Sequence, residues 1–246
     1  MNQFLKSLPV LGFLLKLAER LRWKFHMWKV DPSRLLQRYL RGQKNLFLLQ
    51  IGSNDGLNGD PIFAALKVQS SWKALLVEPV PYLFGRLKQN YDGNNRVQFA
   101  NVAIAEEATP GIFYYLDASA KLHFPDLPSW FDQLGSFDRN HIIKHLGVAM
   151  EPFIRTLDIP TVSLPSLLEQ HEVSQIDVLH IDTEGYDWKI LRQLNLKKFR
   201  PKLILFEYKH LQEAERLAAM AFLKPAYRIT DLDVSGDYLC ERIRGI

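Results

Sequence analysis

The chain has 246 residues, of which 47% are hydrophobic and 24% charged, so it can bury the core of one α/β domain and is not a largely disordered protein. Its formal net charge is +4, and beyond the first 30 residues it shows no basic stripe, which argues against a nucleic-acid partner. The single cysteine, Cys240, cannot form an internal disulfide, which fits a reducing compartment such as the cytoplasm.

The first 30 residues mix bulky apolar side chains with six basic residues and one acidic residue, Glu19. This composition is typical of a helix that packs on the domain or on a partner, or of one that lies on a membrane surface. Lys16 interrupts the apolar run that a secretory signal needs. A second helix is predicted over 32–41. We therefore predict an N-terminal helical extension over 1–45, with peripheral membrane contact as one possible role.

From residue 46 onward, short and continuously apolar strands alternate with helices of about ten residues. Strands are predicted over 46–51, 74–78, 97–104, 112–116, 177–181, 203–206, 227–232 and 237–242, and helices over 60–68, 82–90, 139–146, 165–171, 187–194 and 211–223. The alternation predicts one α/β domain over 46–246, with a mostly parallel sheet covered by helices on both faces. The turn signal Ser235-Gly236 predicts that the last two strands form an antiparallel pair.

Residues 117–153 interrupt this alternation with three prolines and several aromatic residues. A long segment of this kind is typical of a lid over a binding site. The alternative is an insertion that only covers one edge of the sheet. Trp130, Phe131 and Phe137 would contact a ligand in the first case and form the segment's own small core in the second.

The turn after the first strand has the sequence Gly52-Ser53-Asn54-Asp55-Gly56. Glycine has no Cβ, which lets the backbone approach a ligand closely. Asp60 is in the capping position of the next predicted helix, with Pro61 in its first turn. A crevice at the carboxyl end of a parallel strand is where nucleotide-like cofactors bind in open α/β sheets.

Three further strand ends carry residues that would meet at the same edge. Glu78 follows Gly56 near the spacing of about 20 residues at which an acid accepts the ribose hydroxyls of a nucleoside. Asn101 and Val102 would meet an adenine edge, and Asp182 ends the fourth strand. The chain lacks G-x-G-x-x-G and G-x-x-x-x-G-K-[ST], which argues against dinucleotides and nucleoside triphosphates. A nucleoside without a pyrophosphate remains, such as S-adenosylmethionine.

These segments resemble the FkbM family of methyltransferases, in order and spacing, over about residues 46–240. The resemblance is carried by Leu49-Gln50-Ile51-Gly52-Ser53-Asn54-Asp55-Gly56, Val77-Glu78-Pro79-Val80-Pro81, Asn101-Val102-Ala103-Ile104 and Ile181-Asp182-Thr183-Glu184-Gly185-Tyr186-Asp187. It implies a seven-stranded Rossmann-like sheet, S-adenosylmethionine as the methyl donor, and transfer usually to a hydroxyl oxygen. It also implies cofactor contacts at Gly52, Asn54, Gly56, Glu78 and the tip of the third strand.

Gln50 departs from the pattern of many methyltransferases, which carry an acid two residues before the first glycine. Glutamine can orient the loop but gives no charge to the ammonium group of the cofactor, which Asp55 or Asp182 would supply instead. We therefore count Gln50, Asp55 and Asp182 among the expected cofactor contacts. The same departure supports an alternative, a non-catalytic scaffold protein with this fold, and a dehydrogenase is a second alternative.

The resemblance favours a small-molecule or glycan acceptor, methylated on a hydroxyl of a sugar or a secondary metabolite. Such a transfer needs a group that takes up the hydroxyl proton. The candidates are Asp182, Glu184 and His180, and Asp182 is favoured because it lies nearest the crevice. In the alternative interpretation, His180 is a packed strand residue and Glu184 caps the next helix.

A bound metal ion is a further alternative. Asp182 and Glu207 end neighbouring strands and offer the oxygen ligands that Mg²⁺ prefers. His141 and His145 share a helix face but lack the glutamate of H-E-x-x-H. We therefore expect these two histidines to be solvated or packed within the lid rather than to bind a metal.

Overall fold

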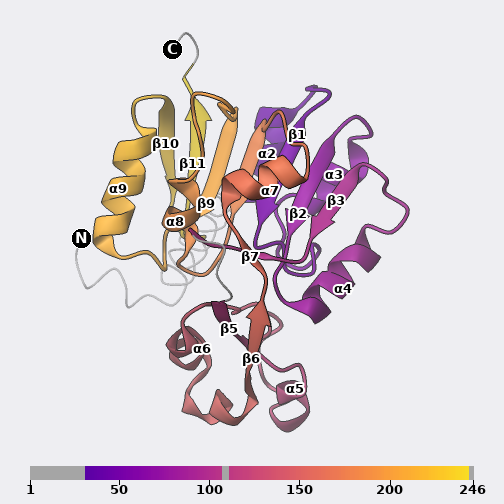
Figure 1. Cartoon of the computed structure of the whole chain (residues 1–246), viewed down its shortest axis with the longest axis vertical. Coiled ribbons are helices and arrows are strands. Elements are labelled where there is room, and N and C mark those ends of the chain that lie inside the picture. The colour runs from indigo at the N-terminus through magenta and orange to yellow at the C-terminus, as the bar shows by residue number, and fades with distance from the viewer. Residues whose placement is uncertain (1–30, 107–110, 244–246) are drawn as a thin grey trace, which may run out of the picture.

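The computed structural model describes residues 31–106 and 111–243. Its centre is a seven-stranded sheet of order β10-β11-β9-β8-β1-β2-β3 (Figure 1). The strands are β1 (Phe47–Ile51), β2 (Lys73–Val77), β3 (Val97–Ala100), β8 (Val178–Ile181), β9 (Leu203–Glu207), β10 (Tyr227–Leu232) and β11 (Asp237–Arg242). Neighbours pair in parallel except for β11, which is antiparallel to both β9 and β10. The predicted Rossmann-like sheet and its antiparallel closing pair are confirmed.

Helices cover both faces of the sheet, as continuously apolar strands require. One face is covered by α2 (Pro32–Leu40), α3 (Phe63–Val68) and α4 (Pro81–Asn90), and the other by α7 (Leu164–Gln170), α8 (Asp187–Leu191) and α9 (Glu213–Leu223). Successive strand residues point to opposite faces, so Leu48 packs with the first set of helices and Leu49 with the second. Removing both faces from water is the main favourable contribution to folding.

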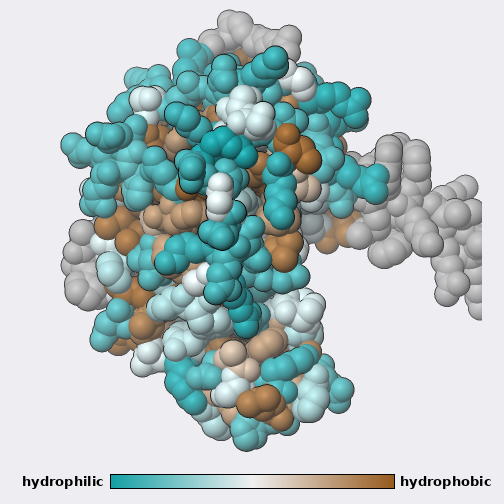
Figure 2. All heavy atoms as spheres, turned by 90° about the vertical axis from the view of Figure 1, so that its right-hand side faces the viewer, coloured by the Kyte–Doolittle hydropathy of each residue, from teal (hydrophilic) through white to brown (hydrophobic). Residues whose placement is uncertain are grey.

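Residues 111–159 form a separate lobe, seen at the bottom of Figure 1, which we call the insert. Its strands β5 (Gly111–Leu116) and β6 (Ile154–Ile159) form an antiparallel pair. Between them come α5 (Ala120–His123), α6 (Arg139–Leu146) and the 3-10 helix η2 (Val148–Phe153). Its surface in Figure 2 mixes hydrophobic and hydrophilic side chains. The insert has a small core of its own, made of Leu116, Ala120, Phe131, Leu134, Ile142 and Met150.

The prediction of one third strand over 97–104 is wrong. The chain leaves the sheet after Ala100, and β4 (Ala103–Ile104) pairs instead with β7 (Thr161–Val162) in a separate two-stranded ladder. The break lies at Asn101, whose side-chain amide donates to Glu78 O at 2.8 Å and to Pro79 O at 2.9 Å. These bonds tie the chain to the tip of β2 and turn it toward the insert.

The predicted N-terminal extension lies partly outside the described residues, because the description begins at residue 31. Within the described part, Leu36 and Leu40 of α2 are buried in the core of the sheet domain. The division at residue 45 and the membrane contact of residues 1–30 stay predictions. Across residues 31–106 and 111–243, no helix combines the length and apolar character needed to cross a membrane.

Candidate active site

The tips of β1, β2 and β8 meet at one edge of the sheet. The parallel register places Ile51 beside both Val77 and Ile181, so the residues that follow them emerge together. Gly52, Glu78 and Asp182 line one pocket, which we call the main pocket. Its lining combines apolar side chains with a few polar groups, which is typical of sites for small organic ligands.

At both glycines of the first turn, neighbouring protein atoms leave no room for a side chain. Gly52 has a φ of +82°, and a Cβ there would lie 1.7 Å from the carbonyl oxygen of Asp182. Gly56 has a φ of +66°, and a Cβ there would lie 2.3 Å from Leu87 Cδ1 in α4. The sequence-based expectation that glycine makes room for a ligand stays a prediction, and the structure adds a packing role. Glycine lets the β1 turn pack against the β8 turn and against α4.

Glu78 links the tips of two strands through its buried carboxylate. Its Oε2 accepts a hydrogen bond from the Asn54 N–H and its Oε1 accepts one from the Val80 N–H, both at 2.8 Å. Burial raises the pKa of Glu78 to about 7, although these two bonds act in the opposite direction. Each oxygen keeps a further lone pair, so Glu78 can also accept hydrogen bonds from a ligand in the main pocket.

The tip of the third strand contributes through its backbone and through Val102. Val102 lines the main pocket, whereas Asn101 does not, because its side-chain nitrogen holds the carbonyls of Glu78 and Pro79. Asn101 therefore positions Glu78. Asn54 lines the pocket as expected.

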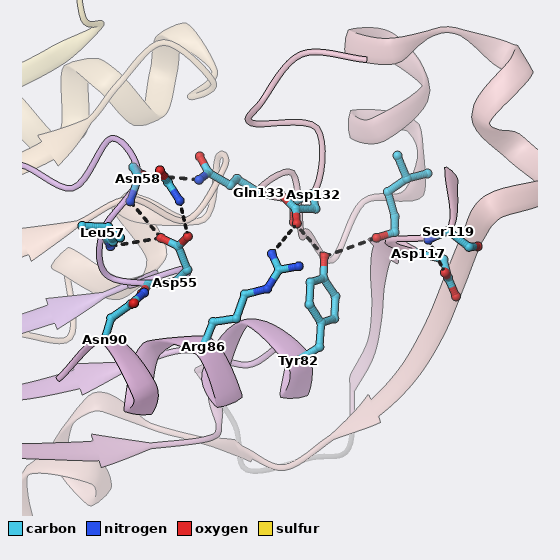
Figure 3. A network of polar contacts seen from close by, with 11 residues as sticks. Asp55, Leu57, Asn58, Tyr82, Arg86, Asn90, Asp117, Ser119, Asp132 and Gln133 are labelled. Atoms are coloured by element: carbon cyan, nitrogen blue, oxygen red, sulfur yellow. Dashed lines mark hydrogen bonds and ion pairs between the residues drawn. The ribbon is translucent and has the colours of Figure 1, made fainter. Parts of the chain in front are cut away.

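Asp55 shapes its own turn and lines neither hollow described here. Its carboxylate accepts hydrogen bonds from the N–H groups of Leu57 and Asn58, at 3.0 and 2.9 Å, and from the Asn58 side chain (Figure 3). Asn90 of α4 donates to the Asp55 carbonyl at 2.8 Å. The structure thus gives no support to Asp55 as a partner for the cofactor's ammonium group.

A second hollow adjoins the main pocket and shares Gly52, Asn54 and Asp182 with it. Gln50 and Asp60 also line this second hollow. The expected cap role of Asp60 is corrected, because α3 begins only at Phe63 with Ile62 as its N-cap, while Asp60 accepts the Ile62 N–H at 2.7 Å. Burial raises the pKa of Asp60 to about 6. Sequence reasoning missed this acid close to Gln50.

Three polar atoms of the second hollow are buried with no hydrogen-bond partner among the described residues. They are Gln50 Oε1, Asp60 Oδ2 and His180 Nδ1. Buried polar atoms are rarely left unpaired, so these atoms are suited to bind a polar ligand group. Burial lowers the pKa of His180 to about 4, which leaves a neutral imidazole near neutral pH.

The β8 turn carries Asp182 and Glu184 into the main pocket. Burial, together with the charges of Glu184 and Asp187, raises the pKa of Asp182 well above its ordinary value. Glu184 does not cap α8, whose N-cap is Tyr186. Its Oε2 lies instead 2.9 Å from His141 Nε2 of the insert.

Glu207, at the end of β9, is buried and forms an ion pair with Lys209. Burial and neighbouring carboxylates raise the pKa of Glu207 to about 10. Among the described residues, Glu207 can share a metal ion with Glu184 and His210, and Asp182 belongs to no such group. The structure therefore does not support the predicted pairing of Asp182 with Glu207 around Mg²⁺.

The insert closes one side of the main pocket. This side of the pocket is lined by Phe113, Gln133, Gly135 and Phe137. The ring centroids of Phe137 and Tyr186 lie 5.1 Å apart. Phe131 is buried in the core of the insert and Trp130 is exposed, and neither lines the pocket. Phe113 and Gln133 had no signal in the sequence beyond lying in or beside the irregular segment.

Side chains of α4 hold the insert over the pocket, and Figure 3 shows Tyr82 and Arg86 rising from one side of this helix toward the insert. The Tyr82 hydroxyl lies 3.2 Å from the Asp132 carbonyl and 3.4 Å from the Leu116 carbonyl. Arg86 Nη1 lies 3.0 Å from Asp132 Oδ2. Gln133 donates to the carbonyl of Asn58 at 3.3 Å. The insert is thus attached to both α4 and the β1 turn.

Solved methyltransferase structures share similarity with this chain at low sequence identity. A precorrin-6Y C5,15-methyltransferase from Geobacter metallireducens has 13% identity and a TM-score of 0.39, covering 80% of this chain and 71% of that chain. An O-methyltransferase from Bacillus cereus, in complex with S-adenosylhomocysteine, has 11% identity and a TM-score of 0.44, with 86% and 80% covered. The N-methyltransferase NodS from Bradyrhizobium japonicum has 11% identity and a TM-score of 0.41, with 86% and 83% covered. A comparison with curated proteins finds no significant match.

The family comparison is more informative. The model of the methyltransferase FkbM domain matches residues 50–232. This range begins in β1, ends at the last residue of β10, and includes the main pocket and the insert. The chain therefore belongs to the FkbM family of S-adenosylmethionine-dependent methyltransferases.

Proposed function

We propose that this methyltransferase acts on a hydroxyl oxygen of a small molecule or glycan, such as a sugar or a secondary metabolite. The observation that supports this most strongly is the convergence of Gly52, Glu78 and Asp182 on one pocket beneath the insert. A nucleoside ligand needs an acceptor for its ribose hydroxyls beside an apolar wall for its base. Glu78 offers the first, and Val80, Leu83 and Val102 offer the second.

The second hollow suits the amino-acid end of the cofactor. The buried oxygens Gln50 Oε1 and Asp60 Oδ2 have no hydrogen-bond partner among the described residues, and both can accept from an ammonium group. The carboxylate of Asp60 supplies the charge that Gln50 lacks. His180 lines the same hollow, so we assign it to the cofactor rather than to the acceptor.

The cofactor supplies an activated methyl group, so the protein mainly has to align the acceptor with it. Alignment alone can lower a barrier by about 7–11 kcal/mol in favourable cases. We propose that Asp182 accepts a hydrogen bond from the acceptor's hydroxyl group and takes up its proton as the methyl group is transferred, a role that the raised pKa of Asp182 favours. The space between Asp182, Phe137 and Tyr186 would receive the acceptor, with the insert excluding water.

The location and further partners follow from the sequence. We propose a cytoplasmic enzyme whose residues 1–30 contact the membrane surface through apolar and basic side chains. We propose that the methyl acceptor is not a nucleic acid. Mg²⁺ at Asp182 and Glu207 stays a separate prediction, and the comparison of Mg²⁺ with Zn²⁺ described below tests it.

Calorimetry and labelled methyl transfer test the proposal together. S-Adenosylmethionine should bind the full chain, and Asp182→Asn should bind it with similar affinity while losing turnover. Mass spectrometry of cell extracts incubated with a labelled donor identifies the acceptor and the methylated atom. No binding at millimolar ligand would favour the scaffold alternative, and label on nitrogen or carbon would overturn O-methylation. Full turnover in Asp182→Asn would remove its proposed role.

A further inference from the structure

Three histidines meet where the insert touches the sheet domain. His141 and His145 are one turn apart on α6, and His210 follows the end of β9. Their ring centroids lie 4.6 Å apart for His141 and His145, 4.7 Å for His141 and His210, and 4.9 Å for His145 and His210. One ring nitrogen from each lies within 4.8 Å of the other two.

This cluster contains nitrogen atoms that the protein itself does not satisfy. His145 Nε2 is buried without a hydrogen-bond partner among the described residues, whereas His210 Nε2 contacts a carboxylate in a geometry that does not make a hydrogen bond. His210 Nε2 lies 3.2 Å from Glu184 Oε2, and the same oxygen lies 2.9 Å from His141 Nε2. An unpaired buried polar atom costs about 1–3 kcal/mol. Packing alone therefore does not explain this cluster of three imidazoles, two of which contact the Glu184 carboxylate.

The surrounding charges favour a cation. Glu184 and Glu207 each offer a carboxylate oxygen within 4.8 Å of a ring nitrogen of His210, and Lys209 pairs with Glu207. Carboxylates removed from water are costly unless cations neutralise them. A divalent ion beside Glu184 would supply that neutralisation.

We propose that His141, His145, His210 and Glu184 bind a divalent transition-metal ion of the zinc type. Imidazole nitrogens suit Zn²⁺, whereas Mg²⁺ takes oxygen ligands in an octahedral arrangement. Two histidines at i and i+4 on one helix, completed by a third histidine and a carboxylate, give the four ligands of a tetrahedral site. Zinc–nitrogen bonds of about 2.0–2.1 Å require the side chains to move inward from their present spacing.

The ion would join elements that are far apart in the sequence. α6 belongs to the insert, while Glu184 and His210 follow β8 and β9 of the sheet. Because Glu184 also lines the main pocket, the ion would fix the insert against the side of the pocket where we place the acceptor. The metal site itself stands on its own residues and does not depend on the proposed acceptor.

Zinc binding by the purified full chain tests the proposal. After treatment with a chelator, Zn²⁺ titrated alone should bind with a stoichiometry of one in calorimetry and should raise the melting temperature, and Mg²⁺ should do neither. Co²⁺ in the same site should show the visible absorption of tetrahedral coordination. Hydrogen exchange should slow in α6 when Zn²⁺ is added, because the ion links α6 to the sheet.

Variants separate this site from incidental surface binding. His145→Gln and His210→Gln should each weaken Zn²⁺ binding by more than about 100-fold, because loss of an outer partner of a metal ligand already costs about 10–100-fold. His123→Gln is the matched control, since His123 also lies in the insert but packs on Phe153 outside the cluster. Circular dichroism confirms that each variant is folded.

Two results would overturn the proposal. One is the absence of Zn²⁺ binding by the wild-type chain, together with no tetrahedral Co²⁺ spectrum. The other is Zn²⁺ binding that survives in both His145→Gln and His210→Gln. Stabilisation by Mg²⁺ but not by Zn²⁺ would overturn the proposal too, and would instead support the oxygen-ligand site predicted at Asp182 and Glu207. If a variant does not fold, the Co²⁺ spectrum of the wild-type chain still decides the question.

Discussion

Glu78 is a buried carboxylate that both fixes neighbouring backbone and faces the main pocket. It accepts the N–H groups of Asn54 and Val80, which fixes the tips of β1 and β2. It also keeps free lone pairs toward the main pocket. Burial removes this carboxylate from water, which disfavours its charged form and raises its pKa from 4.5 to about 7. The site thus keeps a carboxylate ready for a ligand at the expense of stability.

This cost predicts how stability depends on pH. The folded protein holds the Glu78 proton more tightly than the unfolded chain does, so its contribution is fully present below the unfolded pKa and is lost as pH rises through about 7. Relative to Glu78→Gln, which cannot ionise, the wild-type chain should lose about 2–3 kcal/mol of unfolding free energy between about pH 5 and pH 8. Urea unfolding of both chains at each pH measures this difference. A constant difference across that range would mean that Glu78 is not buried as described.

Gly52 is the position where a single added carbon would do most damage. A Cβ would lie 1.7 Å from the Asp182 carbonyl, and φ is +82°. Gly52→Ala should lower the free energy of unfolding by more than about 2 kcal/mol, and it should also abolish cofactor binding. Gly42→Ala is the control, because Gly42 has a similar φ of +75° but nothing within 4 Å of its Cβ position. Equal losses in both variants would show that φ alone matters.

Sequence reasoning recovered the residues whose role is fixed by position at a strand end. Gly52, Glu78 and Asp182 each follow a buried strand directly, and they do share one pocket. Asp60 was assigned the wrong role, and Asp55 lines neither hollow, because local spacing does not tell which way a side chain turns after a glycine. His210 had no local signal at all. It meets His141 only because the insert folds back onto the end of β9.

At the scale of elements, α4 joins the insert to the sheet domain. Tyr82 is the central contact, since its hydroxyl lies within hydrogen-bond distance of carbonyls on both β5 and the segment before α6. Its ring also belongs to the apolar cluster of Val80, Phe113 and Ile159 that lies between the two parts. The position of the insert therefore depends on α4 and the β1 turn as well as on the chain segments that connect it to the sheet.

Tyr82→Phe should loosen the insert without unfolding the sheet domain. The change removes the hydroxyl and leaves buried carbonyls short of a donor, at a cost of about 1–3 kcal/mol. Hydrogen exchange should accelerate in residues 131–137 and remain slow in β1 and β8. Tyr115→Phe is the control, because Tyr115 packs on Tyr82 and its hydroxyl has no hydrogen bond among the described residues. Equal acceleration in both variants would contradict the role given to the Tyr82 hydroxyl.

The elements that sequence reasoning placed well are those that local pattern determines. β10, β11 and α6 have the predicted bounds, because turn and cap residues mark their ends: Ser235-Gly236 between the two strands, and Asp138 and Gly147 at either end of α6. β6 was missed, since most of its residues are exposed or half-buried and only its pairing with β5 makes it a strand. The break after β3 was missed because it depends on Asn101 binding two carbonyls of another strand.

At the scale of the whole molecule, the main pocket lies where two separately packed parts meet. The sheet domain has its own cores on both faces, and the insert has a small core of its own. Pocket residues come from both, with Gly52 and Glu78 from the sheet and Phe113 and Phe137 from the insert. A ligand in this pocket therefore contacts both parts at once, and binding should stabilise the molecule as a unit.

This coupling can be measured by thermal unfolding with S-adenosylhomocysteine. A ligand at about 100 times its Kd stabilises the folded state by about 2.7 kcal/mol, which should raise Tm by about 5–10 °C for a chain of this size. Glu78→Ala should weaken binding by about 1–3 kcal/mol and show a correspondingly smaller shift at the same ligand concentration. NADH should give no shift, because the chain has no pyrophosphate-binding glycine motif. A shift with NADH alone would favour a dehydrogenase, and an unchanged shift in Glu78→Ala would remove Glu78 from the cofactor site.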